Sequence, residues 1–490
     1  MTWVRAMGLA VALLTFGISP AEAATPSTPT GVKVSTTATA AKITWPATRY
    51  ATSYRVCLRT AIGVKSCVRL STKSSTRSRT FKNLTPTTGT DYFAIVTAYR
   101  GSTSRSSTPK GFDLPPNRVP SMTATGWTPS SLTLTWRRAR NADGYLLQLA
   151  TSPDFRTGLM NFGTTANGRT LRGLSSGRVY YFRVRARNGN KIGVYSPRFQ
   201  RRIASLPIDM NIVTYNLCGQ NHCFNSLKGS SPAFGKWTSR KAYAARLALK
   251  SKPDFIATQE SGTDTNFGSA LPGYALAYRK SAKSLFYNSS RYTKILSGWV
   301  TLRVVSNESD RYAVWGTFLD KKTFTRFVIF DAHLTSGKGM ANDALREKET
   351  RVLRAANTKY NPYGYPAVFA GDFNSNRDNA NQSKYPGGYD APMKVFTAAG
   401  IADTKALAAT RIHDNFNSYN GAEPVGTRRN GQHLDLIFAT GGRHATTINV
   451  AEWEVIVDLL SDGQTYVTPF ASDHNLVRAK LTIPGFPSRG

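Results

Sequence analysis

The chain has 490 residues, with 64 Lys or Arg against 28 Asp or Glu and a formal net charge of +36. Its length exceeds that of one ordinary domain, so we expect about two to four domains. Beyond the first residues no stretch is apolar over the roughly 20 residues that a membrane-spanning helix needs, which excludes a transmembrane segment.

The first residues have the pattern of a secretion signal. Arg5 precedes an apolar stretch from Met7 to Ile18, and Ala21-Glu22-Ala23 has the small residues of a cleavage site. A membrane anchor is the alternative, but the apolar stretch is too short to cross a bilayer. We therefore expect a signal peptide over residues 1–23 and a secreted, extracellular mature protein.

Positive charge is concentrated in the first half of the mature chain. Residues 25–115 carry 14 basic and 2 acidic side chains, residues 116–206 carry 15 and 2, and residues 207–490 carry 34 and 23. Such a polycation suits docking on a polyanion such as nucleic acid, an anionic wall polymer or anionic lipid, and polysaccharide is a further candidate partner. General basicity that keeps an exported protein soluble is an equally weighted alternative.

Residues 25–206 contain an internal repeat with a period of roughly ninety residues. Ile43-Thr44-Trp45 is followed nine residues later by Tyr54, and Leu134-Thr135-Trp136 is followed at the same distance by Tyr145. Short alternating strands between Ser, Thr, Gly and Pro turns predict a β-sandwich for each unit. In such a sandwich the Trp packs between the sheets, and a later Tyr makes a corner hydrogen bond.

Both units resemble fibronectin type III domains. In the second unit Leu174 leads to the strand Tyr180–Ala186, whereas in the first unit two extra residues separate Leu84 from Tyr92. The resemblance implies modules that space or tether another domain and do not catalyse a reaction. We expect three domains after the signal peptide, over residues 25–115, 116–206 and 207–490.

Four cysteines remain in the mature chain, an even number that suits an oxidising compartment. Nine residues separate Cys57 from Cys67, and four separate Cys218 from Cys223. We predict two local disulfides, each stabilising the fold by roughly 2–3 kcal/mol. A metal site at the second pair is the alternative because His222 adjoins Cys223, but this cluster supplies fewer than four good ligands.

The pattern of the chain changes from Ile208 onward. Strand-like stretches such as Met210–Tyr215 and Phe327–Asp331 alternate with the helical patterns of Thr238–Lys250 and Asn342–Asn357. In the helical stretches Ala and Leu recur every three to four residues among charged side chains. The mixture predicts an α/β domain with a large core.

The most informative stretch of this domain is a buried strand, Ala367–Ala370, followed by Gly371, Asp372 and Asn374. Residues two apart in a strand share a face, so the carboxylate and the amide project together beyond the strand end. An acid that accepts a proton beside an amide that binds a phosphate oxygen suits phosphoryl chemistry. An ordinary Asx turn is the structural alternative.

Other segments of the same domain also combine an apolar stretch with polar residues suited to metal and phosphate binding. These polar residues are Asn216, Glu260, His333, Asp435, Asp473 and His474. Any one of them alone is more often structural, but the whole set points to a shared site at strand ends.

In order and spacing, these residues resemble the DNase I-like endonuclease/exonuclease/phosphatase superfamily over about residues 208–484. The resemblance implies a multidomain chain in which two all-β sandwiches precede a four-layer α/β sandwich of two β-sheets flanked by helices. It also implies cleavage of phosphate esters in DNA, RNA, sphingomyelin or phosphoinositides. Asn216 and Glu260 match the metal-binding positions, with Glu260 as a direct ligand, and Asp473 matches a further acid at the metal or at the attacking water. Mg²⁺, or Mn²⁺ in its place, suits these oxygen ligands better than zinc.

The resemblance also implies roles for the remaining residues. His474 matches the His that binds the scissile phosphate or activates water, and Asp435 matches its orienting partner. Asp372 and Asn374 match the pair that handles the nucleophile and a non-bridging oxygen. His333 matches a His placed near the leaving oxygen. For both histidines a core position without catalytic function is the alternative.

Two positions depart from the secreted DNases of the family. Glu260 is followed by Ser261-Gly262, where those enzymes have an Arg two residues on that contacts DNA. Ala282-Lys283-Ser284 enters the strand on which those enzymes carry an acidic partner for the middle His. The departures affect the choice of substrate more than the chemistry.

We predict a monomeric, Mg²⁺-dependent phosphodiesterase that acts as an endonuclease on DNA or RNA. One alternative is a sphingomyelinase-like or phosphoinositide phosphoesterase, which needs exposed aromatic side chains near the site. The best aromatic cluster, Tyr360, Tyr363 and Tyr365, precedes the strand that ends at Asp372 and should lie at the opposite sheet edge. Another alternative is a matrix- or polysaccharide-binding protein with the enzyme domain as a passenger.

Overall fold

A computed structural model describes residues 24–71, 77–85, 92–219, 234, 237–262, 266–302, 311–376, 378–379, 387–425, 432–444 and 448–486. The predicted signal peptide, residues 1–23, lies outside these ranges. The chain forms two compact units: one contains residues up to 123 with 134–169 and 181–199, and the other contains 124–133, 170–180 and 200–490. No helix in the described ranges has the length and apolar character that crossing a membrane requires.

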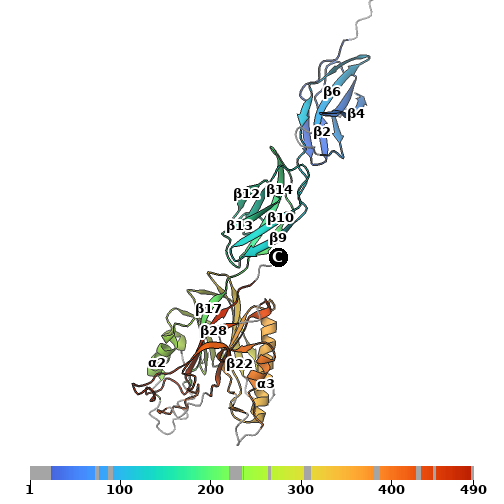
Figure 1. Cartoon of the computed structure of the whole chain (residues 1–490). Helices are drawn as coiled ribbons and strands as arrows, with labels where there is room; N and C mark the ends of the chain where they lie inside the picture. The colour runs from blue at the N-terminus through green and yellow to red at the C-terminus, as the bar shows by residue number, and fades with distance from the viewer. Residues whose placement is uncertain are drawn as a thin grey trace, which may run out of the picture. The chain divides into compact units, whose positions relative to one another are not determined.

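The first module consists of two antiparallel sheets, some of whose strands are labelled in Figure 1. One sheet contains β1 (Lys33–Thr37), β2 (Ala40–Thr44) and β5 (Ser78–Phe81). The other contains β3 (Ser53–Thr60), β4 (Gly63–Ser71), β6 (Tyr92–Arg100), β7 (Thr103–Ser106) and β8 (Lys110–Phe112). Buried and more exposed residues alternate along β3 and β6, as expected of strands with one face on a core.

The aromatic side chains of this module take the predicted positions. The rings of Trp45 and Tyr54 pack with centroids 5.6 Å apart. The Tyr92 hydroxyl donates a hydrogen bond to the Thr85 carbonyl oxygen at 2.8 Å, so the corner bond forms despite the two extra residues before Tyr92.

One of the two predicted disulfides is confirmed. Cys57 and Cys67 lie directly opposite each other on β3 and β4 and are joined by a disulfide. Cys223 and His222 lie outside the described residues, so the second predicted pair, between Cys218 and Cys223, stays a prediction.

The second module has the same division into a three-stranded and a five-stranded sheet. Its smaller sheet contains β9 (Met122–Thr128), β10 (Ser131–Trp136) and β13 (Gly168–Arg172). Its larger sheet contains β11 (Gly144–Ala150), β12 (Met160–Thr164), β14 (Val179–Asn188), β15 (Lys191–Ile192) and β16 (Phe199–Arg202). Trp136 packs on Tyr145 with ring centroids 5.4 Å apart, which repeats the arrangement of the first module.

The last domain contains two further sheets. In spatial order, the seven-stranded sheet consists of β19 (Tyr274–Lys280), β20 (Lys283–Asn288), β18 (Phe255–Gln259), β17 (Ile208–Asn216), β29 (Leu476–Ile483), β28 (Asn449–Ile456) and β26 (Ala408–Ile412). The six-stranded sheet consists of β21 (Tyr292–Thr301), β22 (Tyr312–Asp320), β23 (Arg326–His333), β24 (Ala367–Asp372), β27 (Asp435–Thr440) and β25 (Ala402–Asp403). The coarse prediction of a β-rich N-terminal region followed by an α/β domain is therefore confirmed.

The helices of this domain are α2 (Trp237–Lys250), α3 (Met340–Tyr360), α4 (Ala391–Thr397) and α5 (Thr404–Leu407), with 3₁₀ turns η2 (Phe267–Ala270) and η4 (Gly442–His444). Helix α2 begins one residue before the predicted stretch and ends with it. Helix α3 extends beyond its predicted end because Tyr360 stacks on Trp315 with ring centroids 4.6 Å apart, which holds the last turn in place.

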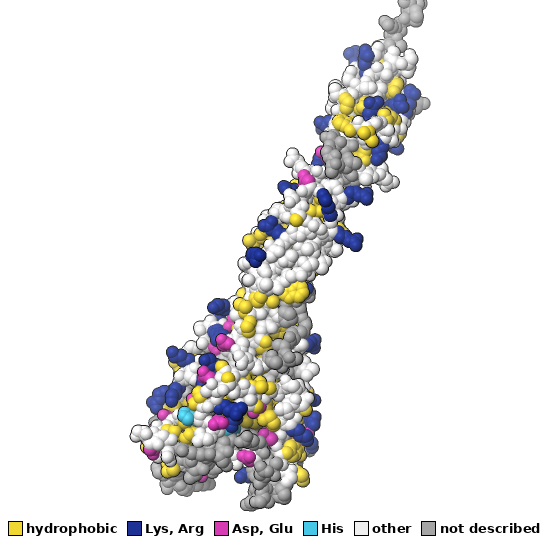
Figure 2. Space-filling view, in the orientation of Figure 1, with side chains coloured by type: hydrophobic (Ala, Val, Ile, Leu, Met, Phe, Trp, Pro, Cys, Tyr) yellow, Lys and Arg dark blue, Asp and Glu magenta, His cyan; other side chains and the backbone are white. Residues whose placement is uncertain are grey.

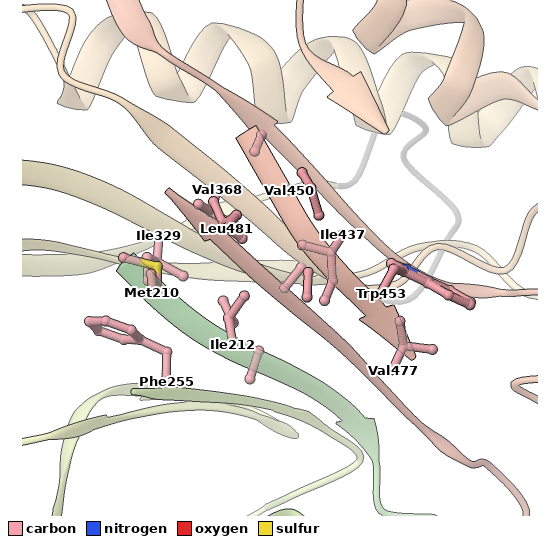
Figure 3. Close-up of a cluster of buried hydrophobic side chains, with 14 of the residues drawn as sticks. Met210, Ile212, Phe255, Ile329, Val368, Ile437, Val450, Trp453, Val477 and Leu481 are labelled. Carbon is pink, nitrogen blue, oxygen red and sulfur yellow. The ribbon is translucent and has the colours of Figure 1, made fainter. Parts of the chain in front are cut away.

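The largest hydrophobic cluster contains buried side chains from both sheets of the last domain (Figure 3). Met210, Ile212 and Phe255 come from the seven-stranded sheet, and Ile329 and Val368 come from the six-stranded sheet. The opposite faces of the same strands are also buried, since α2 packs in a cluster with β17 and β18, and α3 and α4 pack in a cluster with β23 and β24. Burial on both faces explains why these strands are apolar throughout their length.

Candidate active site

The site lies where strands of the two sheets of the last domain meet at one edge. The parallel strands β17 and β18 end at Asn216 and at Gln259, directly before Glu260, and the parallel strands β23 and β24 end at His333 and Asp372. Parallel strands bring their carboxyl ends to the same edge of a sheet.

Two of the predicted positions differ from the expected strand ends. Asp435 is the first residue of β27, and His474 lies two residues before β29 begins. Both strands run antiparallel to their neighbours β24 and β17, so their beginnings reach the edge where the other strands end. The physical reason is the strand direction, which the apolar pattern alone does not reveal.

A cleft of about 620 Å³ opens at this edge, and seven of the eight predicted metal and catalytic residues line it. The eighth, Asp435, is fully buried behind His474. The predicted residues in the cleft wall are Asn216, Glu260, His333, Asp372, Asn374, Asp473 and His474.

Asp372 is at the centre of the polar contacts in the cleft and is only 1% exposed. Its Oδ2 accepts a hydrogen bond from Asn216 Nδ2 at 3.0 Å and lies 3.5 Å from His333 Nε2 and 3.9 Å from His474 Nε2. Its Oδ1 accepts from the backbone N–H of Asn374 at 2.9 Å. One carboxylate therefore faces both imidazoles and the amide of a neighbouring sheet.

Gly371 is required for this arrangement because β23 and β24 approach closely beside it. A Cβ atom at this position would lie 2.0 Å from the Ala332 carbonyl oxygen, a distance that no side chain tolerates. Asn374 follows in a left-handed conformation (φ 50°), and its side-chain amide donates to the Leu334 carbonyl oxygen at 3.1 Å. The glycine and the amide together fix the turn that presents Asp372.

His474 and Asp435 form a buried pair. His474 Nδ1 lies 2.8 Å from Asp435 Oδ2, and the backbone N–H of Asp435 donates to Ser418 Oγ at 3.0 Å. Burial alone lowers the pKa of His474, but the carboxylates of Asp435, Asp473 and Asp372 raise it well above its ordinary value. The raised pKa favours the protonated imidazole, whose Nε2 lies 3.9 Å from Asp372 Oδ2.

Glu260 lies in the cleft wall beside Asn216. The residue adopts a left-handed conformation (φ 52°), and its Oε1 accepts from Asn216 Nδ2 at 3.2 Å. Its Oε2 is buried and has no hydrogen-bond partner among the described residues. A buried carboxylate oxygen without a donor is the arrangement expected at a cation site.

A comparison with protein-family models matches residues 213–474 to the Endonuclease/Exonuclease/phosphatase family. The chain belongs to this family. A second match, over residues 115–202, is to the Fibronectin type III domain. The corresponding assignment of the first module rests on its similar sheets and stays a prediction.

The chain is also similar to solved structures of low sequence identity. A family protein from Bacteroides thetaiotaomicron is 17% identical, with 57% of this chain and 96% of that chain covered and a TM-score of 0.45. A mannosyl-6-phosphatase from the same species is 19% identical, with 56% and 99% covered and a TM-score of 0.43. The human Nocturnin catalytic domain is 18% identical, with 56% and 93% covered and a TM-score of 0.39. A search of curated proteins found no match.

Enzymes of the Endonuclease/Exonuclease/phosphatase family depend on divalent metal ions, and the donors in this cleft fit such an ion. Asp372, Asp435 and His474 place ligand atoms within 4.8 Å of one another. Because Asp435 already occupies His474 Nδ1, the open carboxylate oxygen of Glu260 is the better anchor. Asp473 and Asn216 lie in the same wall; Asp473 can supply further oxygens, while Asn216 Oδ1 already accepts from the Cys218 backbone N–H at 3.0 Å.

His333 is neutral over most of the pH range. Burial lowers its pKa to about 4, and the charges of Lys283 and Arg311 act in the same direction while Asp372 opposes them. Burial lowers the pKa of Lys283 as well, although nearby Asp331 counteracts this. The strand that carries an acidic partner for this His in the secreted DNases begins here with Lys283. Among the described residues, Asp372 is therefore the only carboxylate within 4 Å of His333.

Several residues of the site were not predicted from the sequence. Arg311 and Lys338 line the cleft, and Ser418 Oγ accepts from the backbone of Asp435. Arg240 on α2 donates to the carbonyl oxygens of Cys218 and Ala471, which fixes the segments after Asn216 and before Asp473. Only Lys338, between two glycines in the sequence, has a local pattern that suggests an exposed binding residue.

Proposed function

We propose that the protein is a secreted, Mg²⁺-dependent phosphodiesterase that cleaves DNA or RNA as an endonuclease. The observation that carries the proposal is the arrangement around Asp372. Two imidazoles and an amide surround this carboxylate, and Glu260 in the same cleft wall has a buried carboxylate oxygen without a hydrogen-bond partner among the described residues. A phosphodiester in the cleft would meet a base, hydrogen-bond donors and a cation site together.

When bound, Mg²⁺ would be held by Glu260, Asn216 and Asp473 and would neutralise charge on the phosphate. Asp372 would accept a proton from the attacking water. His474, as a cation oriented by Asp435, would donate a hydrogen bond to a non-bridging oxygen as charge develops there. Neutral His333 would donate a hydrogen bond near the leaving oxygen but would not act as a general acid at neutral pH.

The charge around the cleft supports a polyanionic substrate. Arg311 and Lys338 line it beside the catalytic residues. The Arg311 guanidinium donates to the Leu334 carbonyl oxygen at 2.9 Å, which holds it at the end of β23. Two cations beside one scissile phosphate suit a chain of phosphates better than a neutral ester.

The modules supply a docking surface in this proposal. Figure 2 shows Lys and Arg side chains over the visible face of both modules, with few acidic side chains. On β14 of the second module, Arg183 lies 4.1 Å from the ring centres of both Phe155 and Tyr195, and Arg185 lies 4.6 Å from Tyr195. Aromatic stacking holds these guanidinium groups extended, which favours contact with a phosphate backbone.

Secretion is part of the proposal and is supported by two observations. The Cys57–Cys67 disulfide suits an oxidising compartment. The sequence of residues 1–23 has the pattern of a signal peptide. Cleavage near residue 23 is checked by N-terminal sequencing of protein collected from the culture medium.

A panel assay tests the reaction. Purified protein is incubated with single-stranded DNA, double-stranded DNA, RNA, sphingomyelin vesicles and methyl 4-nitrophenyl phosphate, with Mg²⁺ or with chelator. We expect Mg²⁺-dependent cleavage of nucleic acid into internal fragments. Intact DNA and RNA together with cleaved sphingomyelin would overturn the proposal.

A further inference from the structure

The catalytic residues belong to two rows of side chains that continue beyond the cleft. In the six-stranded sheet Asp435 pairs with Asp372, and Asp372 pairs with His333. On the next strand, β22, Ala313 pairs with Ala332, the residue before His333. Tyr312 comes directly before Ala313 and pairs with Thr301 of β21. Directly paired residues point to the same face of a sheet, so one row extends from Asp435 to the edge strand.

The seven-stranded sheet has a matching row. Asn216 pairs with Gln259, Gln259 pairs with Lys283, and Lys283 pairs with Lys280 at the end of β19. The two rows contact each other at both ends. Asn216 reaches Asp372 at the catalytic end, and the Lys280 ammonium lies 5.0 Å from the ring centre of Tyr312 at the other end.

An exposed indole lies beside the far end of the rows, two residues before Thr301. Trp299 on β21 is 40% exposed, and the Lys280 ammonium lies 4.4 Å from its ring centre. The Trp299 and Tyr312 rings meet edge to face with centroids 5.5 Å apart, which fixes the indole. Within the described part of the chain Lys280 makes no ion pair with a carboxylate, so its charge is available to an anion.

We propose that Trp299, Tyr312 and Lys280 form a subsite for the nucleotide next to the scissile phosphate. The base stacks on the exposed indole, and the adjoining phosphate meets Lys280 and, nearer the cleft, Arg311. This inference rests on the proposed nuclease function. Stacking of a base on an aromatic ring tolerates any sequence, so the subsite would favour unpaired nucleotides without a preference for one base.

The chemistry of the cluster favours a nucleotide over other ligands. An aromatic plane with a cation beside it matches a base that is followed by a phosphate. A bilayer would bury a broad apolar face, whereas the rigid element here is one ring held edge to face by Tyr312 with a cation over it. A single-stranded polynucleotide is therefore the occupant to test.

The test compares two oligonucleotides of equal length and charge, one with bases throughout and one with abasic residues flanking a single cleavable position. In the wild-type protein, kcat/KM should be higher for the oligonucleotide with bases. Trp299→Ala should lower kcat/KM for this oligonucleotide by about tenfold or more and leave the abasic substrate unchanged. Trp299→Phe, which keeps an aromatic plane, should retain most of the activity.

Leu296→Ala is the matched control, because Leu296 is 59% exposed on the same strand but farther from the cleft. It should cleave both oligonucleotides as the wild type does. The inference is overturned if Trp299→Ala lowers both rates equally or neither rate, or if Leu296→Ala has the same selective effect. Failure of the nuclease proposal looks different, because the wild-type protein would then cleave neither oligonucleotide.

Discussion

At the scale of single residues, Asp372 links the two sheets of the domain. Its Oδ2 accepts a hydrogen bond from Asn216 of the seven-stranded sheet and lies beside His333 of its own sheet. Asp372→Asn keeps the shape and removes the base. We expect turnover to fall by at least about a hundredfold while the melting temperature changes little. Steady-state cleavage of an oligonucleotide and thermal unfolding by circular dichroism measure the two effects. Near-normal turnover in this variant would contradict the assignment.

The open oxygen of Glu260 leads to a prediction about the metal. Glu260→Gln removes one negative charge from the site and leaves the size of the side chain unchanged. The Mg²⁺ concentration for half-maximal activity should rise by about tenfold or more, since a direct anionic ligand is lost. The melting temperature of the protein, measured without substrate at increasing Mg²⁺ concentrations, gives an independent readout of Mg²⁺ binding. Glu347→Gln, with the same charge change on α3, should bind Mg²⁺ as the wild type does.

The residues of the site differ in how far the sequence predicted them. Asp372, Asn374 and Glu260 follow apolar strands directly, so their positions could be inferred from the pattern. Arg240 and Ser418 act through contacts with segments distant in the sequence, and no local pattern identifies such contacts. The orientation of Asp435 and His474 required the strand directions, which depend on the pairing of the whole sheet.

At the scale of elements, Glu347 connects α3 with α4 and the segment before it. Its carboxylate accepts hydrogen bonds from Tyr389, Arg351 and Lys394 at 2.7, 2.6 and 3.0 Å. The bond from Tyr389 and then those from Arg351 and Lys394 lower the pKa of Glu347 to about 2. This contribution to stability is present above the ordinary pKa of a Glu and is lost as the pH falls toward 2.

Glu347→Gln should therefore reduce the dependence of stability on pH between about 4.5 and 2. The loss at neutral pH should be below about 1 kcal/mol, because Arg351 and Lys394 are more than half exposed. Urea unfolding at a series of pH values measures both quantities. An unchanged slope on the acid side would show that the three hydrogen bonds do not persist in solution.

The helices and strands illustrate what a periodic pattern can predict. The apolar spacing of α2 located it to within one residue, since the pattern itself decides which face is buried. The end of α3 was missed because it depends on the stacking of Tyr360 with Trp315, a contact between distant segments. The sheet order, with the first strand beside the last, follows from pairing and cannot be inferred from any one stretch.

At the scale of the whole molecule, the basic modules should determine how the protein responds to salt. Arg183, Arg185 and Arg187 lie on β14 of the second module. Replacement of all three by Gln should weaken binding to a long DNA and lower the slope of log affinity against log salt by about 2 to 3. Turnover on a short oligonucleotide should stay unchanged. Fluorescence anisotropy at several salt concentrations measures the slope.

The control for this prediction is the replacement of Arg137, Arg138 and Arg140, which are exposed in the same module, by Gln. The charge change is identical, so a general effect of net charge would alter both variants equally. A docking surface on β14 requires the first variant to lose more affinity than the second. Equal losses would assign the effect to overall basicity.

The pairing of β17 with β29 has a consequence for when the enzyme becomes active. These are the first and last strands of the domain, and His474 lies just before β29. While the chain is being synthesised, the early strands lack a partner strand that has not yet emerged. The cleft cannot assemble before residue 483 is available, so catalytic activity can appear only once the whole domain has been synthesised. A chain truncated after residue 474 should accordingly be inert even where it accumulates.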